Sequence, residues 1–313
     1  MSREDISFQT ADNVTLRGWF YKPSSSHDEG STSSALPCLI MAHGFSALKE
    51  MDLDTFAEFF TSNLSLTCLV YDNRCFGDSD GQPRQEIVPA LQVSDYSDAI
   101  TYAQTRPEVN TSKIGIWGSS YSGGHVLQVG ACDRRVKAVL SQVPCVDGWA
   151  NFERLIRPDF VPGLNQLFQE GKLLELNRHS RAKGNRPTML PVVDADVHKP
   201  SALPSPDSFE FFTNWEKKSD WKNDVTVKSI ELFRAYNPSA YIHRIGPTPL
   251  LMTVAENDVL TPTTIALESY SRALEPKQIH ILPEAGHFDG YSGPLFERNS
   301  QVQLEFLRKY LCG

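Results

Sequence analysis

The segment Gly118-Ser119-Ser120-Tyr121-Ser122-Gly123 constrains the fold more than any other part of this chain. It follows the apolar run 114–117 and precedes a helical stretch at about 121–130, so it predicts a buried strand that turns sharply into a helix. Small residues are needed around such a turn, because a bulky side chain would collide with the helix or a neighbouring strand. Ser120, held above the edge of the sheet, is therefore the candidate nucleophile, although Ser122 stands where the usual G-x-S-x-G pattern has glycine.

Two further polar residues follow late strands of the chain. The apolar strand 249–254 runs into a loop that ends in Asp258, and the strand 278–282 runs into a loop that contains His287. In folds with a serine on such a turn, an acid and then a histidine follow it along the chain, each on a loop after a late strand. A neutral imidazole takes the proton of the serine, and a carboxylate orients the imidazole. The sequence predicts that Ser120, Asp258 and His287 are the catalytic residues.

Two other residues compete for these roles. Asp147 follows the strand 136–140 and is an alternative acid to Asp258. His43 follows the strand 38–42 and is an alternative base. Because His43 precedes the serine and leaves His287 without a role, we interpret it as a residue that supports its loop by hydrogen bonding.

Acyl transfer also requires donors for the oxyanion that forms on the attacked carbonyl. One backbone N–H comes from the residue after the nucleophile and the other from a loop near the start of the sheet. The loop His43-Gly44-Phe45-Ser46 follows a buried strand and is placed to supply the second. The backbone N–H groups of Phe45 and Tyr121 are therefore the predicted oxyanion hole.

Strand and helix signals alternate along most of the chain. This alternation predicts an α/β fold, with a mainly parallel, doubly wound sheet and helices on both faces. A strand pattern begins almost at the N-terminus, and further strands are expected at 14–21, 38–42, 66–71, 114–117, 136–140, 249–254 and 278–282. Helices are expected at 52–61, 89–104, 121–130 and 263–273.

The alternation breaks between residues 149 and 244. We expect a helical cap here, inserted between core strands six and seven, with residues 1–148 and 245–313 forming the core. Helices are expected at 160–176 and 225–236, separated by a loop that contains Pro187, Pro191, Pro200, Pro204 and Pro206. The segment is rich in aromatic residues, which either pack the cap onto the core or line a pocket that excludes water and binds an apolar acyl chain.

Charge and cysteine content restrict the class of partner and the compartment. The net charge of −8 argues against nucleic-acid binding, and no apolar run is long enough to span a membrane. The six cysteines lack paired metal spacing, and the N-terminus shows no secretory signal, so we expect free thiols and a cytoplasmic location. The acidic turn 72–81 is interpreted as a hydrogen-bonded turn, with a metal site as its alternative. No metal or cofactor is expected.

Several motifs together resemble those of a known family. They are His43-Gly44-Phe45-Ser46-Ala47-Leu48-Lys49-Glu50, the turn 72–81, the segment 118–124, Asn237-Pro238-Ser239-Ala240-Tyr241, and the loops that contain Asp258 and His287. The chain thereby resembles α/β-hydrolases of the dienelactone-hydrolase and X-prolyl-dipeptidyl-peptidase-like type, and within them the fungal polyketide transferase and thiohydrolase group. Cys75 departs from the pattern, because the family turn usually has glycine there.

The resemblance implies the α/β-hydrolase fold and the same three catalytic residues, Ser120, Asp258 and His287. It further implies a serine esterase, thioesterase or polyketide acyltransferase of secondary metabolism. The expected substrate is a small-molecule ester or thioester of an apolar acyl chain, free or presented by an acyl carrier protein. An X-prolyl-type peptidase and a non-hydrolytic cyclase remain alternatives. The choice between hydrolysis and transfer and the oligomeric state stay open.

Overall fold

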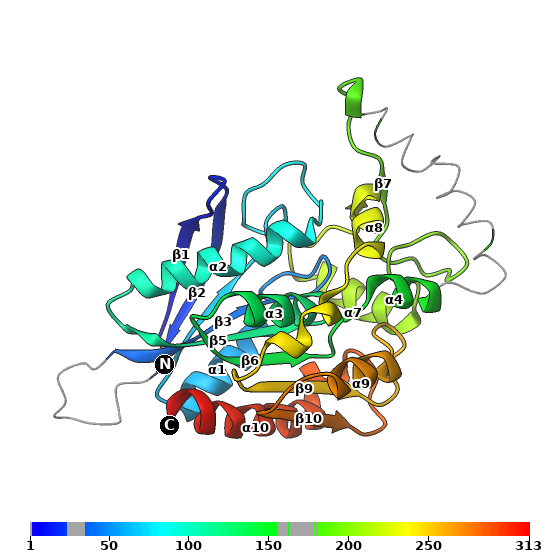
Figure 1. The fold of residues 1–313 in the computed structure, drawn as a ribbon. Helices are drawn as coiled ribbons and strands as arrows, with labels where there is room; N and C mark the ends of the chain where they lie inside the picture. Colours follow the sequence, from blue (N-terminus) through cyan, green and yellow to red (C-terminus); the bar gives the residue numbers. More distant parts are fainter. Residues whose placement is uncertain (1, 24–34, 156–161, 163–177, 179–180) are drawn as a thin grey trace.

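The computed structural model of the chain describes residues 2–23, 35–155, 162, 178 and 181–313. Within these residues eight strands form one sheet in the order β1-β2-β4-β3-β5-β6-β9-β10 (Figure 1). Their bounds are β1 Ser2–Gln9, β2 Thr15–Lys22, β3 Leu36–Ala42, β4 Thr67–Tyr71, β5 Val109–Ser119, β6 Val136–Gln142, β9 Leu250–Ala255 and β10 Lys277–Leu282. The predicted α/β-hydrolase architecture is confirmed.

The sheet is parallel except at one edge. β2 pairs antiparallel with both β1 and β4, and every other neighbouring pair is parallel. All residues of β4 and β9 are buried, as are nearly all of β3 and β6. Such continuous apolar strands are typical of a parallel sheet that is covered on both faces. The carboxyl ends of β3, β5, β6, β9 and β10 consequently meet at one edge, where loops from distant parts of the chain converge.

Helices cover both faces of the sheet. The longer helices are α1 Leu53–Asn63, α2 Pro89–Thr105, α3 Tyr121–Cys132, α9 Thr263–Ser271 and α10 Gly293–Leu307. Side chains of α2, α3 and α9 join the hydrophobic cluster on one face, and those of α1 and α10 join the cluster on the other. Short helical turns are η1 Pro238–Ala240, η2 Ile242–Arg244, η3 Asp289–Tyr291 and η4 Arg308–Cys312. Four of the five long helices match predicted ones to within about two residues, and α10 is an addition.

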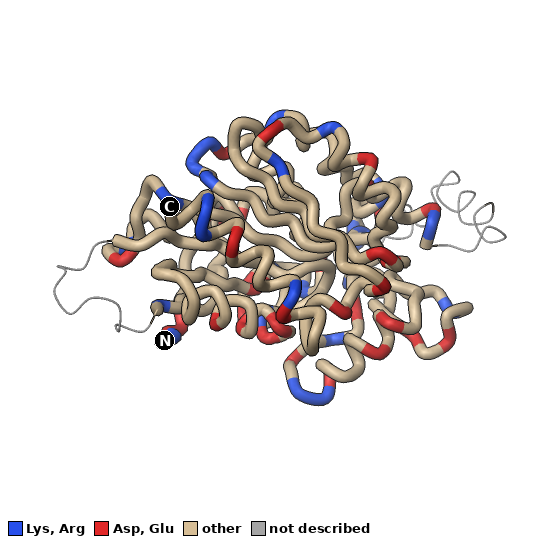
Figure 2. The backbone as a smooth tube through the Cα atoms, turned by 90° about the horizontal axis from the view of Figure 1, so that it is seen from below, with Lys and Arg blue, Asp and Glu red and all other residues tan. Residues whose placement is uncertain are grey.

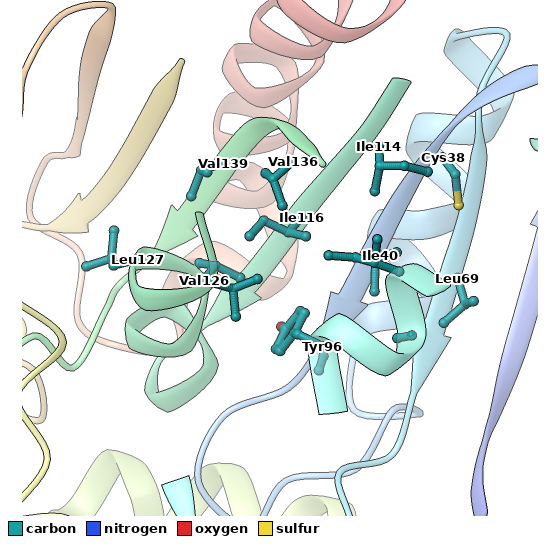
Figure 3. Packing of buried hydrophobic residues seen from close by; sticks show 14 of the residues in the cluster. Cys38, Ile40, Leu69, Tyr96, Ile114, Ile116, Val126, Leu127, Val136 and Val139 are labelled. Atoms are coloured by element: carbon teal, nitrogen blue, oxygen red, sulfur yellow. The ribbon is translucent and has the colours of Figure 1, made fainter. Parts of the chain in front are cut away.

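The larger cluster packs α2 and α3 against the centre of the sheet. Figure 3 shows side chains of β3, β4, β5 and β6 meeting Tyr96 of α2 and Val126 and Leu127 of α3. These side chains are fully buried. Burial of apolar surface contributes about 25 cal/mol per Å², so this layer holds α3 firmly at the end of β5. The turn that carries Ser120 therefore lies between two packed elements, β5 before it and α3 after it.

The segment between β6 and β9 adds no strand to the main sheet among the residues described. Its elements are α4 Gly148–Leu155, β7 Met189–Leu190, α7 Pro206–Glu216, β8 Val225–Thr226 and α8 Val227–Arg234, and β7 and β8 pair with each other. The helix predicted at 160–176 lies almost wholly outside the described residues. The division into a core of 1–148 and 245–313 and a cap of 149–244 stays a prediction.

Two predictions within this segment need correction. The sequence places Pro206 in a loop, but it is the first residue of α7, and the side chain of Ser205 accepts the N–H of Ser208 at 3.4 Å. A proline at the first helical position after a serine cap starts a helix, since its missing N–H would have no partner there. The helix expected at 225–236 begins later, at Val227, because Val225 and Thr226 pair with β7.

Two further features are the distribution of surface charge and the state of the cysteines. Charged residues of both signs are interspersed over the view in Figure 2. All six cysteines are free, and Cys38, Cys68, Cys75 and Cys145 are buried. In the described part of the chain, no helix is both long and apolar enough to cross a membrane.

Candidate active site

Ser120 lies at the sharp turn between β5 and α3. Its φ of 56° and ψ of −114° place it in a region that non-glycine residues rarely occupy. Its N–H donates to the carbonyl of Gln142 at 2.8 Å, which ties the turn to β6. A Cβ atom at Gly118 would lie 2.1 Å from the carbonyl oxygen of Ser122, so the chain requires glycine before the turn. Backbone strain of this kind costs about 1–3 kcal/mol and persists only where the surroundings enforce it.

The structure brings Ser120, His287 and Asp258 into one hydrogen-bonded chain. His287 Nε2 lies 3.0 Å from Ser120 Oγ, and His287 Nδ1 lies 2.7 Å from Asp258 Oδ2. Because a carboxylate only accepts, Nδ1 carries the proton and Nε2 is free to accept the hydroxyl proton of Ser120. Both His287 and Asp258 are buried.

Asp258 is itself held by its own loop. Its Oδ1 accepts the N–H groups of Leu260 at 2.9 Å and Thr261 at 2.7 Å. The hydroxyl of Thr261 lies 2.8 Å from Oδ2. Several donors directed at one carboxylate hold it in a single orientation toward His287.

The two competing residues have other partners. Asp147 lies directly before α4, where its Oδ1 accepts the N–H of Ala150 at 3.0 Å, so it caps that helix. His43 Nε2 donates to the carbonyl of Met51 at 2.9 Å, and His43 Nδ1 accepts the N–H of Gly44 at 2.7 Å. Burial lowers the pKa of His43 to about 3, so its ring stays neutral. His43 supports its loop, in line with its interpretation from the sequence.

The predicted oxyanion donors flank Ser120. A Cβ atom at Gly44 would lie 2.6 Å from Ser120 Cβ, so only glycine lets this loop come so close to Ser120. Phe45 comes next, and its N–H donates to no other described residue. Tyr121 is the first residue of α3, where a helix has no carbonyl for the backbone N–H. Both amides are therefore available to an oxygen bound beside Ser120.

The side chain of Tyr121 has a different environment from its backbone. Its hydroxyl is buried with no hydrogen-bond partner among the described residues, and its ring packs on Phe45 and Phe233. Replacing Tyr121 by Phe should raise the free energy of unfolding by about 1 kcal/mol, because an unsatisfied buried hydroxyl is removed. Activity should be retained, since the backbone amide is unchanged. Urea unfolding and an esterase assay measure the two effects.

Tyr236 offers a matched control for this change. Its hydroxyl lies 2.7 Å from His125 Nδ1, so Tyr236→Phe removes a satisfied bond and should destabilise the protein. Equal destabilisation by Tyr121→Phe and Tyr236→Phe would contradict the assignment of Tyr121.

A cavity opens beside Ser120 and His287. Its walls are mainly aromatic and aliphatic, and they combine core loops with residues from 149–244: Phe45, Tyr121, Asn151, Leu203, Phe212, Phe233, Leu260, Phe288 and Tyr291. Of the aromatic residues in the predicted cap, Phe212 and Phe233 line the cavity, whereas Trp221 stacks on Phe212 with a ring separation of 4.8 Å. Asn151, Leu203 and Phe233 were not predicted from the sequence, because nothing in their local pattern distinguishes a lining residue from a packing residue.

A buried polar network beneath the site was also not predicted. Tyr291 stacks on His43 with a ring separation of 5.4 Å, and its hydroxyl contacts the hydroxyl of Ser119. The network continues through Gln142, Asn299, Gln303 and Trp117, with hydrogen bonds of 2.7–2.8 Å. It connects the Ser120 turn to the loop of His43 and to the segment after His287. Fully satisfied networks of this kind make a site rigid.

The acidic turn 72–81 is held by ion pairs. Asp72 contacts Lys49 Nζ at 2.7 Å, and Arg74 bridges Asp95 and Asp12 at 2.5 and 2.7 Å. No group of three or more metal-ligating side chains occurs among the residues that the structure covers. Cys75 is buried and has a φ of 71°, a conformation that favours the glycine expected at this position.

Comparisons with known proteins identify the family. The alpha/beta hydrolase family matches residues 39–302. The polyketide transferase grgF of a Penicillium species is 32% identical over 100% of this chain and 98% of that protein. A thiohydrolase of Eupenicillium brefeldianum is 31% identical, with 98% and 94% covered.

A solved structure agrees with these sequence relatives. The crystal structure of the alpha/beta hydrolase GrgF from Penicillium sp. sh18 has a TM-score of 0.83 at 32% identity, with both chains fully covered. The family and these relatives confirm the prediction that the chain is an enzyme of the hydrolase or acyltransferase type. As its motifs predicted, the chain belongs to the alpha/beta hydrolase family.

Proposed function

We propose that this enzyme forms an acyl-enzyme on Ser120 and acts on an ester or thioester of an apolar, polyketide-like acyl chain in secondary metabolism. The observation that carries the proposal is the chain of contacts from Ser120 Oγ to His287 Nε2 at 3.0 Å and from His287 Nδ1 to Asp258 at 2.7 Å. The names of the relatives support the thioester and the polyketide chain, and the apolar cavity walls support the acyl class.

The first half-reaction transfers the acyl group to the enzyme. Ser120 Oγ attacks the carbonyl carbon while His287 Nε2 takes the hydroxyl proton, and the N–H groups of Phe45 and Tyr121 donate to the oxyanion. The C–S or C–O bond then breaks, and His287 returns the proton to the leaving thiol or alcohol. Asp258 stabilises the imidazolium throughout.

The second half-reaction releases the acyl group. Water or an alcohol gives its proton to His287 Nε2 and attacks the acyl-enzyme carbonyl, and the bond to Ser120 Oγ breaks as that oxygen regains the proton. Hydrolysis and transfer therefore differ only in the acceptor. We infer hydrolysis as the default reaction, because water needs no binding site of its own. The acyl chain reaches the enzyme either in a small-molecule ester or thioester or attached to an acyl carrier protein.

The two alternative functions make different demands on the site. A peptidase of the X-prolyl type needs an anionic group for the free amino terminus, and no Asp or Glu lines the described part of the cavity. A cyclase that uses only the pocket and the base needs no covalent intermediate. Detection of an acyl-enzyme therefore separates the proposal from the cyclase.

A thioester panel tests the proposal. The full chain is mixed with N-acetylcysteamine thioesters of graded acyl length, with and without a primary alcohol. The release of free thiol and the mass of the intact protein are then measured over time. We expect turnover and a transient mass increase equal to the acyl group. Thiol release without any acylated protein under rapid quenching would argue for direct attack by water, and cleavage of prolyl amides instead of thioesters would favour the peptidase.

A further inference from the structure

Asn151 is a polar residue in the wall of the cavity beside Ser120. It lies on α4, in the segment that follows β6, and it lines the same cavity as Ser120 and His287. The residue is only 5% exposed. Its backbone is fixed, since its N–H donates to the carbonyl of Asp147 at 2.9 Å.

The position of α4 is set by contact with α8. The N–H of Gly148 donates to the carbonyl of Tyr236 at 2.7 Å, and a Cβ atom at Gly148 would lie 1.9 Å from the carbonyl oxygen of Phe233. The first turn of α4 therefore packs directly on the backbone at the end of α8. Asn151, one turn later, is held against the cavity by this close contact.

The amide of Asn151 has no hydrogen-bond partner among the described residues. The amide is not among the described polar atoms that are both fully enclosed and unpaired, so it stays accessible to a small molecule. Four other polar side chains around the cavity are engaged: His43 with Met51 and Gly44, Thr261 with Asp258, Tyr291 with Ser119, and His287 with Ser120 and Asp258. The hydroxyl of Tyr121 also has no partner among the described residues, but it is fully enclosed and therefore less accessible to a ligand. Asn151 carries the one side-chain amide of the described cavity wall.

We propose that Asn151 binds an oxygen carried by the acyl chain, and so selects oxygenated chains over fully reduced chains of the same length. This rests on the proposed function. An amide donates through Nδ2 to a carbonyl or hydroxyl oxygen and accepts a hydroxyl proton at Oδ1, so it suits a keto or hydroxy substituent. The acyl chain is the partner because it stays beside Ser120 in both half-reactions, whereas the acceptor needs only to reach His287 Nε2.

The test compares matched thioesters in two proteins. The N-acetylcysteamine thioesters of octanoic, 3-oxooctanoic, 3-hydroxyoctanoic and 5-hydroxyoctanoic acid are assayed with the wild-type enzyme and with Asn151→Leu, which has similar side-chain volume. The wild type should prefer at least one oxygenated chain by about 10- to 100-fold in kcat/KM, the range expected for a single buried hydrogen bond. Asn151→Leu should lose this preference, so that oxygenated and fully reduced chains react with similar kcat/KM.

Asn214→Leu is the matched control, because it makes the same change at an exposed position of α7 and should keep the wild-type preference. Equal preference in wild type and Asn151→Leu would overturn the assignment while the proposed function stands. An altered ratio of alcohol transfer to hydrolysis with unchanged acyl preference would also overturn it. No turnover of any thioester by the wild type would overturn the proposed function and this assignment together.

Discussion

Replacing Ser120 by Ala is expected to lower kcat by about 10⁴- to 10⁶-fold, the largest effect of any single change in this protein. The substitution removes the atom that attacks the carbonyl, so His287 has no proton to accept and no acyl-enzyme forms. The oxyanion donors and the cavity remain, and they account for the residual rate. Folding should be unaffected, because alanine meets the same backbone strain at a φ of 56° as serine does.

Fluorophosphonate labelling measures this prediction directly. The wild type should be labelled at Ser120, and Ser120→Ala should not be labelled. Ser112→Ala is the control, because Ser112 is exposed on the early part of β5 and its loss leaves the site intact. Equal labelling of wild type and Ser120→Ala would show that another residue reacts, and an unlabelled wild-type enzyme that still turns over thioesters would contradict the covalent mechanism.

Replacing Asp258 by Asn is expected to lower kcat by about 10³- to 10⁴-fold. The amide can still accept the N–H groups of Leu260 and Thr261, so the loop should keep its shape. It can also turn its NH₂ group toward His287 Nδ1, which places the proton on Nε2 and removes the acceptor for the Ser120 hydroxyl. The expected result is a folded enzyme with normal thermal stability and very slow acylation.

Asp147→Asn is the matched change at the competing acid. Asparagine caps a helix as well as aspartate does, so α4 should persist and kcat should stay within about threefold of the wild type. The acylation rate with a fluorophosphonate or a thioester, measured at pH 7–8, compares the two variants. A large loss in Asp147→Asn together with a small one in Asp258→Asn would reverse the assignment of the acid.

Much of the core could be predicted because its signals are local. The strand ending at Ala42 and the helix α3 each follow from apolar runs and turn residues that lie within a few positions of one another. Pro206 shows the limit of this reasoning. A proline in a proline-rich stretch indicates a loop, and only the preceding Ser205, whose side chain caps the helix, distinguishes a helix start.

The sequence could predict those residues of the candidate site that follow directly after a strand. Ser120, Asp258 and His287 each follow a strand, and parallel strands bring their carboxyl ends to one edge. The hydrogen-bond lengths between them, and the assignment of Asp147 to helix capping instead, required the structure. Both acids follow strands in the sequence, and only the path of each loop decides which of them contacts His287.

By itself, the sequence determined the alternating core, the Ser120 turn and the positions of Asp258 and His287 after late strands, because each is encoded by neighbouring residues. Tertiary structure alone decided which groups surround Ser120. Asn151 faces the cavity because Gly148 packs on the backbone of α8, and Gly44 approaches Ser120 because β3 and β5 are adjacent in the sheet. Such contacts join residues that are far apart along the chain. Which groups act together depends on their distance in space, and a local sequence pattern does not give that distance.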